Sequence, residues 1–137
     1  MVLIRTEFGK TIGGFSQYKW NKEYSGNYVN DAARQSCLLQ LDLHEKMIPI
    51  HDQSLIMCKK TLGPTFGGGW DLSISDCCNK NNNSLVNLGH TYNNLRPERR
   101  YDFESQTTWT AICGNPSGKN FMVEEYEVFK VTWDKKE

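Results

Sequence analysis

The 137-residue sequence lacks an excess of charge of either sign, and it lacks a run of about 18 apolar residues. Without such a run, no segment is expected to cross a bilayer as a helix. The 16 basic and 16 acidic residues balance to a formal charge of zero. This balance removes the electrostatic reason to expect nucleic acid or a membrane surface as a general partner. The opening residues are also too few for a secretory signal peptide.

A disulfide framework is also missing. The five cysteines form one adjacent pair and have no repeating spacing: Cys37, Cys58, Cys77, Cys78 and Cys113. An odd count in this pattern predicts reduced thiols in the cytoplasm, with association to an organelle or a cilium left open. A metal site built from Cys77, Cys78, Cys113 and His90 would lack the paired cysteine spacing that is typical of zinc. We therefore expect no metal.

The sequence has no phosphate-binding loop, although Gly67, Gly68 and Gly69 are consecutive. A P-loop continues into Gly-Lys-Ser/Thr at the start of a helix. Here Trp70 and Asp71 follow instead, and no amphipathic helix comes next. We therefore expect no nucleotide or other cofactor. The glycines are typical of a tight connection between strands whose backbones approach closely.

Short β-strands are predicted over most of the chain. Residues 36–43 alternate most regularly, and this pattern places Cys37, Leu39, Leu41 and Leu43 on one face and Gln40 on the other. Residues 71–76 also alternate, which predicts a strand with one face exposed to solvent. Strands repeated at about 8–12 residues are typical of a β-sandwich.

Three further segments complete the predicted fold. Pro49, within residues 46–50, favours a strand at the edge of a sheet. Residues 107–113 are rich in threonine and tryptophan and predict another strand. Residues 121–133 predict one long closing strand. The whole chain, residues 1–137, is expected to form one mainly β domain with few short helices.

Three motifs carry a family resemblance. Residues 8–15 read FGKTIGGF and are followed by Trp20, residues 66–74 read FGGGWDLSI, and residues 124–129 read EEYEVF. In this order they resemble the TLDc domain, the oxidation-resistance family, and most closely the TLDc domains of single-celled eukaryotes, in which asparagine-rich insertions like residues 79–83 are common. Members usually carry a helical segment and a further strand before the point at which this sequence begins, so we expect that this N-terminal segment is missing.

The resemblance implies a sandwich of two antiparallel sheets and a role in protection against oxidative stress. Several family members bind the vacuolar-type proton ATPase and regulate it or promote release of its soluble catalytic sector. A non-enzymatic protein-binding module is therefore the first expectation. The alternatives are a structural component of a large assembly, such as a ciliary or respiratory complex, or an enzyme that uses Glu127 or a cysteine.

The candidate functional residues are two glutamates and the glycine motifs. Glu125 and Glu127 fall on the otherwise apolar odd-numbered face of residues 121–133. An inward-pointing Glu127 would need hydrogen-bond donors, for which the backbone amides of the glycine-rich turns are the best source. A bulge near Glu125 would turn one carboxylate outward. The resemblance also marks this glutamate position as one of suspected function. The motif residues are Gly13, Gly14, Gly67, Gly68, Gly69 and Asp71.

The remaining polar candidates have no defined pairing in the sequence. His44, His51 and His90 could each serve a cysteine nucleophile as a base. The four cations Arg96, Arg99, Arg100 and Lys119 could form a small basic patch that docks on an acidic protein surface. A solvated loop explains these four cations equally well.

Overall fold

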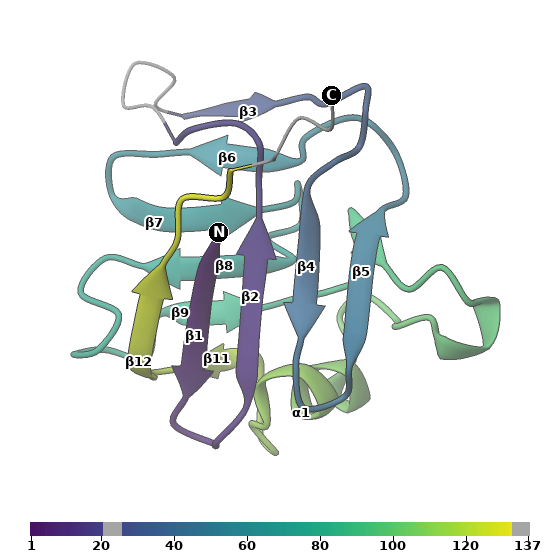
Figure 1. The fold of residues 1–137 in the computed structure, drawn as a ribbon. Coiled ribbons are helices and arrows are strands. Elements are labelled where there is room, and N and C mark those ends of the chain that lie inside the picture. The colour runs from purple at the N-terminus through teal and green to yellow at the C-terminus, as the bar shows by residue number, and fades with distance from the viewer. Residues whose placement is uncertain (21–25, 133–137) are drawn as a thin grey trace.

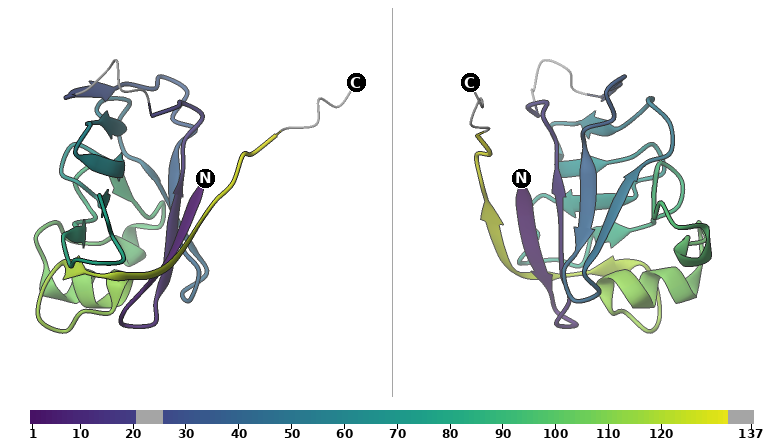
Figure 2. Two further views of the ribbon diagram at one scale, coloured as in Figure 1. Left: turned by 90° about the vertical axis from the view of Figure 1, so that its left-hand side faces the viewer. Right: turned by 45° about the vertical axis from the view of Figure 1, so that its right-hand side comes forward.

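The computed structural model describes residues 1–20 and 26–132, which form two six-stranded antiparallel sheets. In Figure 1 the strands of the front sheet run across those of the sheet behind it. Figure 2 shows the two layers from the side. The predicted β-sandwich with few short helices is confirmed. No helix within the described residues is long and apolar enough to span a membrane.

The first sheet contains the first strand and the last strand of the described chain. Its strands, in spatial order, are β10 (Tyr92–Asn93), β5 (Glu45–Pro49), β4 (Cys37–Gln40), β2 (Thr11–Phe15), β1 (Val2–Thr6) and β12 (Val123–Val128). The first strand of the chain pairs with the last, with Leu3 opposite Glu127. This pairing makes β12 the outermost strand on its side of the sheet.

The second sheet contains the glycine-rich stretch. Its strands, in spatial order, are β11 (Asn120–Phe121), β9 (Ser84–Val86), β8 (Leu72–Ser75), β7 (Leu62–Phe66), β6 (Ile56–Cys58) and β3 (Asn27–Val29). β7 and β8 form an antiparallel pair in which Phe66 lies opposite Leu72. The stretch is therefore a strand-to-strand connection, as the glycines predict.

The core lies between the two sheets and is rich in aromatic side chains. Phe66, Tyr92 and Phe121 are fully buried. The Phe66 ring makes edge contacts with Trp20, at 5.1 Å between centroids, and with Tyr92, at 6.3 Å. Such edge-to-face pairs stabilise a core beyond the apolar area that they bury.

The prediction of a strand at residues 107–113 is wrong, because this segment is the helix α1 (Gln106–Cys113). Ser105 precedes the helix, and Gly114 ends it with a left-handed φ of 85°. These are ordinary start and stop signals of a helix. Thr108, Ile112 and Cys113 are its buried residues, and their spacing is that of one helix face. The helical spacing of the buried residues and the stop signal at Gly114 outweigh the β propensity of threonine and tryptophan.

The predicted closing strand is two strands in two different sheets. β11 pairs with β9 in the second sheet, and β12 pairs with β1 in the first. Met122 lies between them, where the chain passes from one sheet to the other. β12 ends at Val128, and the predicted end at Trp133 lies outside the described residues.

The strand predicted over residues 36–43 is shorter than expected. β4 ends at Gln40, and it buries Leu38 and Gln40 on its inner face, while Leu41 and Leu43 are exposed. Gln40 is accommodated because its amide donates to the Ile112 carbonyl and its oxygen accepts from the N–H of Leu43.

The solvent-exposed face predicted for residues 71–76 is likewise buried along β8. The hydroxyls of Ser73 and Ser75 make hydrogen bonds with Thr65 and Ser84 on neighbouring strands. Pro49 does not mark a sheet edge either, because β10 pairs outside it and places Tyr92 opposite the proline. In both cases a neighbouring strand covers a face or an edge that the sequence alone predicts to be exposed.

Candidate docking surfaces and the glycine-rich motifs

The glycine-rich turn closes the connection between β7 and β8. The N–H of Trp70 donates to the carbonyl of Gly67 at 3.1 Å. Gly67 has a φ of +86°, which favours glycine. A Cβ atom at Gly69 would meet the His90 ring and the side chain of Phe103. The turn therefore needs glycine both for its backbone angles and for its close contacts.

Asp71 ties this turn to the other sheet. Its fully buried carboxylate accepts hydrogen bonds from the N–H groups of Gly89, Thr91 and Tyr92 at 2.9–3.2 Å. Tyr92 belongs to β10 of the first sheet, whereas Asp71 directly precedes β8 of the second. Burial raises the pKa of the Asp71 carboxyl, and the three backbone donors oppose that rise. We assign Asp71 the structural task of holding the two sheets together.

The two glycine motifs meet inside the sandwich. Gly14 faces the core, and three atoms of the Phe66 ring lie within 2.9 Å of the position a Cβ would occupy. Gly13 faces outward, where a Cβ would meet the Val2 carbonyl and the Leu3 side chain. A side chain at either position would therefore displace a neighbour.

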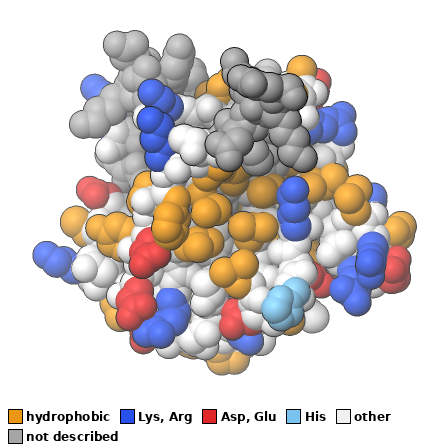
Figure 3. Space-filling model, viewed as in Figure 1, with side chains coloured by type: hydrophobic (Ala, Val, Ile, Leu, Met, Phe, Trp, Pro, Cys, Tyr) orange, Lys and Arg blue, Asp and Glu red, His pale blue; other side chains and the backbone are white. Residues whose placement is uncertain are grey.

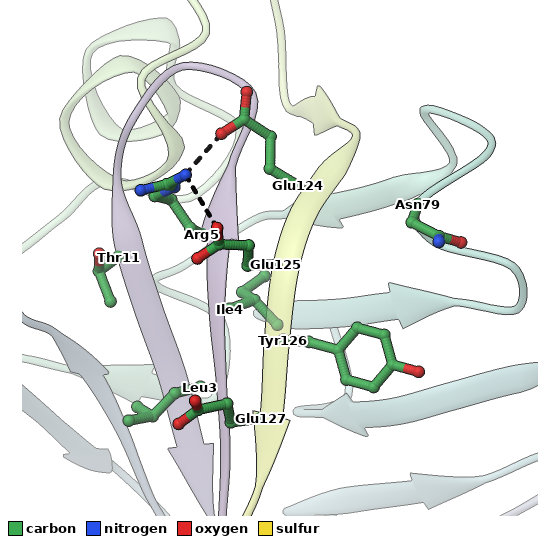
Figure 4. Close-up of a pocket in the computed structure, with 9 residues that line it drawn as sticks. All are labelled: Leu3, Ile4, Arg5, Thr11, Asn79, Glu124, Glu125, Tyr126 and Glu127. Atoms are coloured by element: carbon green, nitrogen blue, oxygen red, sulfur yellow. Dashed lines mark hydrogen bonds and ion pairs between the residues drawn. The ribbon is translucent and has the colours of Figure 1, made fainter.

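The expected burial of Glu127 is wrong. Glu127 and Glu125 are both exposed, because they lie opposite Leu3 and Arg5 on the outer face of the first sheet. The register shifts so that Arg5 pairs with Glu125 and Thr6 with Val123, and this irregularity turns both carboxylates, not one, to the outer face. Arg5 forms ion pairs with Glu124 at 3.3 Å and Glu125 at 3.2 Å, as Figure 4 shows.

An apolar groove crosses the outer face of the first sheet, the face turned away from the second sheet. Figure 3 shows hydrophobic side chains gathered over the strands of this sheet. The groove has a volume of about 690 Å³ and is lined by Met1, Phe15, Arg34, Gln35, Ser36, Cys37, Leu39, Lys46, Ile48 and Val131. Its charged lining residues, Arg34 and Lys46, are both cations. We call this feature the outer-face groove.

The sequence contained a signal for this groove, although the signal did not indicate which side of the sheet the apolar residues would face. The alternation in residues 36–43 placed Cys37 and Leu39 on one face, and they do share a face. Cys37 lies opposite Phe15, and Leu39 lies opposite Gly13, on the outer side of the sheet. Apolar residues on an outer sheet face cannot be told from core residues by their period alone.

The other candidates do not converge. His51 and His90 approach each other at 6.4 Å between ring centroids, but Cys77 and Cys78 lie in the separate loop between β8 and β9. Within residues 1–20 and 26–132, no three His, Cys, Asp or Glu side chains are placed to hold a metal ion.

Two of the four cations in the predicted basic patch form ion pairs with acidic residues. Lys119 pairs with Glu104 at 3.6 Å and lies over the Trp109 ring. Arg99 approaches Glu45 at 3.9 Å. The two cations therefore have acidic partners on different elements.

All five cysteines are free thiols, and four of them are buried. Burial raises the pKa of Cys37, Cys78 and Cys113, which lowers their thiolate fraction at neutral pH. Cys77 is the exposed one. We therefore expect Cys77 to react first with a thiol reagent in the native protein.

Thiol titration without reductant, before and after unfolding in urea, checks this expectation. One fast thiol in the native protein and five thiols after unfolding are the expected result. A smaller number after unfolding would mean that a disulfide forms.

The comparisons with known proteins agree with this architecture. Residues 1–132 match the family model of the TLDc domain, and neither the curated proteins nor the solved structures give a match. TLDc domains are commonly linked to oxidative-stress resistance and are generally protein-interaction modules. The match covers nearly the whole chain and includes both glycine motifs, which pack against each other through Gly14 and Phe66. The chain therefore belongs to the TLDc domain family.

Proposed function

We propose that this chain is a non-enzymatic protein-binding module that docks a partner in the outer-face groove. The observation that carries this proposal is the apolar lining of the groove, with Phe15, Leu39 and Ile48 on adjacent strands. A contiguous apolar surface on the outer side of a sheet marks an interaction site more often than a chance arrangement. The strands beneath it are held by the core, so the surface is formed before a partner arrives.

The charge around the groove favours a particular kind of partner. Arg34 and Lys46 lie at the groove, and none of the acidic residues that the structure describes lines it. A partner with an apolar centre and an acidic rim would bury the apolar side chains and meet the two cations. Such charge complementarity contributes mainly to specificity and to the rate of association.

The family suggests which partner to test first. The chain would act in oxidative-stress protection, in the cytoplasm, through the vacuolar-type proton ATPase and its soluble catalytic sector. A structural role in a larger assembly would use the same groove. An enzyme that used Glu127 or a cysteine is less well supported, since burial raises the pKa of three of the five thiols.

The experiment is a binding measurement on the purified soluble catalytic sector of this ATPase. The immobilised chain is expected to capture the sector and, when added to the intact enzyme, to promote its release. Capture without release would support binding but not regulation. No capture, together with capture of a different stable assembly identified by quantitative mass spectrometry, would favour the structural role.

A further inference from the structure

Within residues 1–20 and 26–132, no strand pairs with the outer backbone edge of β12. Met1 and Phe129 exchange both of their backbone hydrogen bonds, at 2.8 Å and 2.9 Å. In an antiparallel ladder such pairs alternate with pairs that make no hydrogen bond to each other. Glu127 and Glu125 therefore bond to β1, whereas the N–H and C=O groups of Tyr126 and Val128 point away from it. These four groups have the geometry that an added strand requires.

The side chains beside this open edge are not covered by the second sheet. Tyr126 is 58% exposed and Val128 is 73% exposed. Figure 4 shows the Tyr126 side chain directed away from β1. The pocket along the strand has a volume of about 540 Å³ and is lined by Leu3, Ile4, Arg5, Thr11, Asn79, Glu124, Glu125, Tyr126 and Glu127. An extended segment at this edge would cover both apolar side chains.

The opposite side of β12 is acidic. Glu124, Glu125 and Glu127 lie within four residues, and Arg5 is the cation that pairs with the first two. Among the described residues, no ion pair involves Glu127. The carboxylates of Glu125 and Glu127 stand two residues apart, so they share one face of the strand. In a strand paired with β12, every second side chain would lie on the same face as Glu125 and Glu127.

We propose that β12 is a docking edge for an extended segment of a partner protein in which lysine or arginine alternates with apolar residues. The backbone of the segment pairs with Tyr126 and Val128, its cations meet Glu125 and Glu127, and its apolar side chains cover Tyr126 and Val128. Cross-strand pairs of opposite charge stabilise such an arrangement.

The same charges argue against a second copy of this chain as the occupant. Pairing β12 with β12 would place acidic side chains opposite acidic side chains, which is destabilising. Charged residues on an edge strand are a common means of preventing self-association. The acidic face therefore selects a basic strand and rejects a copy of itself. This docking edge is a different surface from the outer-face groove, and the inference does not depend on that groove.

Fluorescence anisotropy with synthetic peptides tests the proposal. The probe is a labelled peptide of about six residues, the usual length of a strand, in which lysine and valine alternate. We expect the full chain to bind it, and to lose binding when glutamate replaces the lysines. A peptide with the same side chains and N-methylated backbone groups on its pairing edge should also fail to bind, because it cannot extend the sheet.

Two protein variants locate the contact. Reversing the charges in the double variant Glu125→Lys, Glu127→Lys should weaken binding about tenfold or more, since two cross-strand attractions become repulsions. Glu98→Lys, an exposed change of the same sign away from β12, is the matched control and should leave the affinity unchanged. Tyr126→Pro removes an outward N–H without removing a hydrogen bond to β1, and it should abolish binding.

The outcomes separate this inference from the proposed function. No binding, equal binding of the N-methylated peptide, or full affinity of the charge-reversed variant would overturn strand docking. A dimer whose formation is lost in Tyr126→Pro would also overturn it, because the occupant would then be a second copy. If Tyr126→Pro does not fold, the charge-reversed variant decides the question. Partner capture through the outer-face groove can succeed or fail independently of these results.

Discussion

Replacing Asp71 by alanine is expected to lower the free energy of unfolding by about 2–6 kcal/mol. The change removes the carboxylate that accepts from Thr91 and Tyr92, and each buried donor left without a partner costs about 1–3 kcal/mol. Gly89 retains a second acceptor, the carbonyl of Tyr92. Because Asp71 links the two sheets, the loss should affect the cooperative unfolding of the whole domain.

Urea denaturation followed by tryptophan fluorescence measures this effect. Asp52→Ala is the matched control, because Asp52 is exposed, and its expected change is within about 0.5 kcal/mol. Equal stability of the two variants would contradict the structural task that we assign to Asp71. A destabilised but folded Asp71 variant that still binds its partner would separate the glycine motif from the docking surface.

Replacing Leu39 by glutamate is expected to weaken partner binding about 30-fold or more, which corresponds to roughly 2 kcal/mol. Leu39 lines the outer-face groove, so the new carboxylate would have to be buried in the docked complex. The fold should survive the change, because Lys46 lies directly opposite on β5 and supplies a cross-strand cation. Affinity measured by calorimetry, together with the melting temperature, separates lost binding from lost structure.

Leu95→Glu is the control for this prediction. Leu95 is 69% exposed and does not line the outer-face groove. The Leu95→Glu variant replaces leucine by glutamate as Leu39→Glu does, and it should leave the affinity for the partner unchanged. If both variants bind as tightly as the unmodified chain, the groove is not the docking surface.

The sequence was sufficient to predict the sandwich and the tight turn between β7 and β8. The glycine-rich stretch has few structural solutions, because a Cβ atom at Gly67 would meet the Asp71 carboxylate and a Cβ atom at Gly69 would meet His90. The role of Asp71 was not predictable in the same way. Its donors lie some 20 residues further along the chain, and nothing local to residue 71 identifies them.

The wrong predictions have a common physical cause. Neighbouring strands in the tertiary structure decide which face of a short alternating segment is buried. The same alternation describes β4 whether its apolar residues face the core or the outer-face groove. Glu127 was expected inside because residues 121–133 were interpreted as one regular strand, whereas the register shift after Val123 turns Glu127 to the outer face. In the structure β12 lies at the edge of the sheet, and its side chains from Glu124 onward are exposed.

Hydroxyl-radical footprinting of the chain, free and bound to its captured partner, tests the central claim most directly. We expect that Met1, Phe15, Leu39 and Ile48 lose reactivity in the complex, because they line the outer-face groove on the first sheet. Tyr28, on β3 of the second sheet, and Leu95 should keep the reactivity that they have in the free chain. Protection at Tyr28 or Leu95 with no protection of the four outer-face residues would contradict the account.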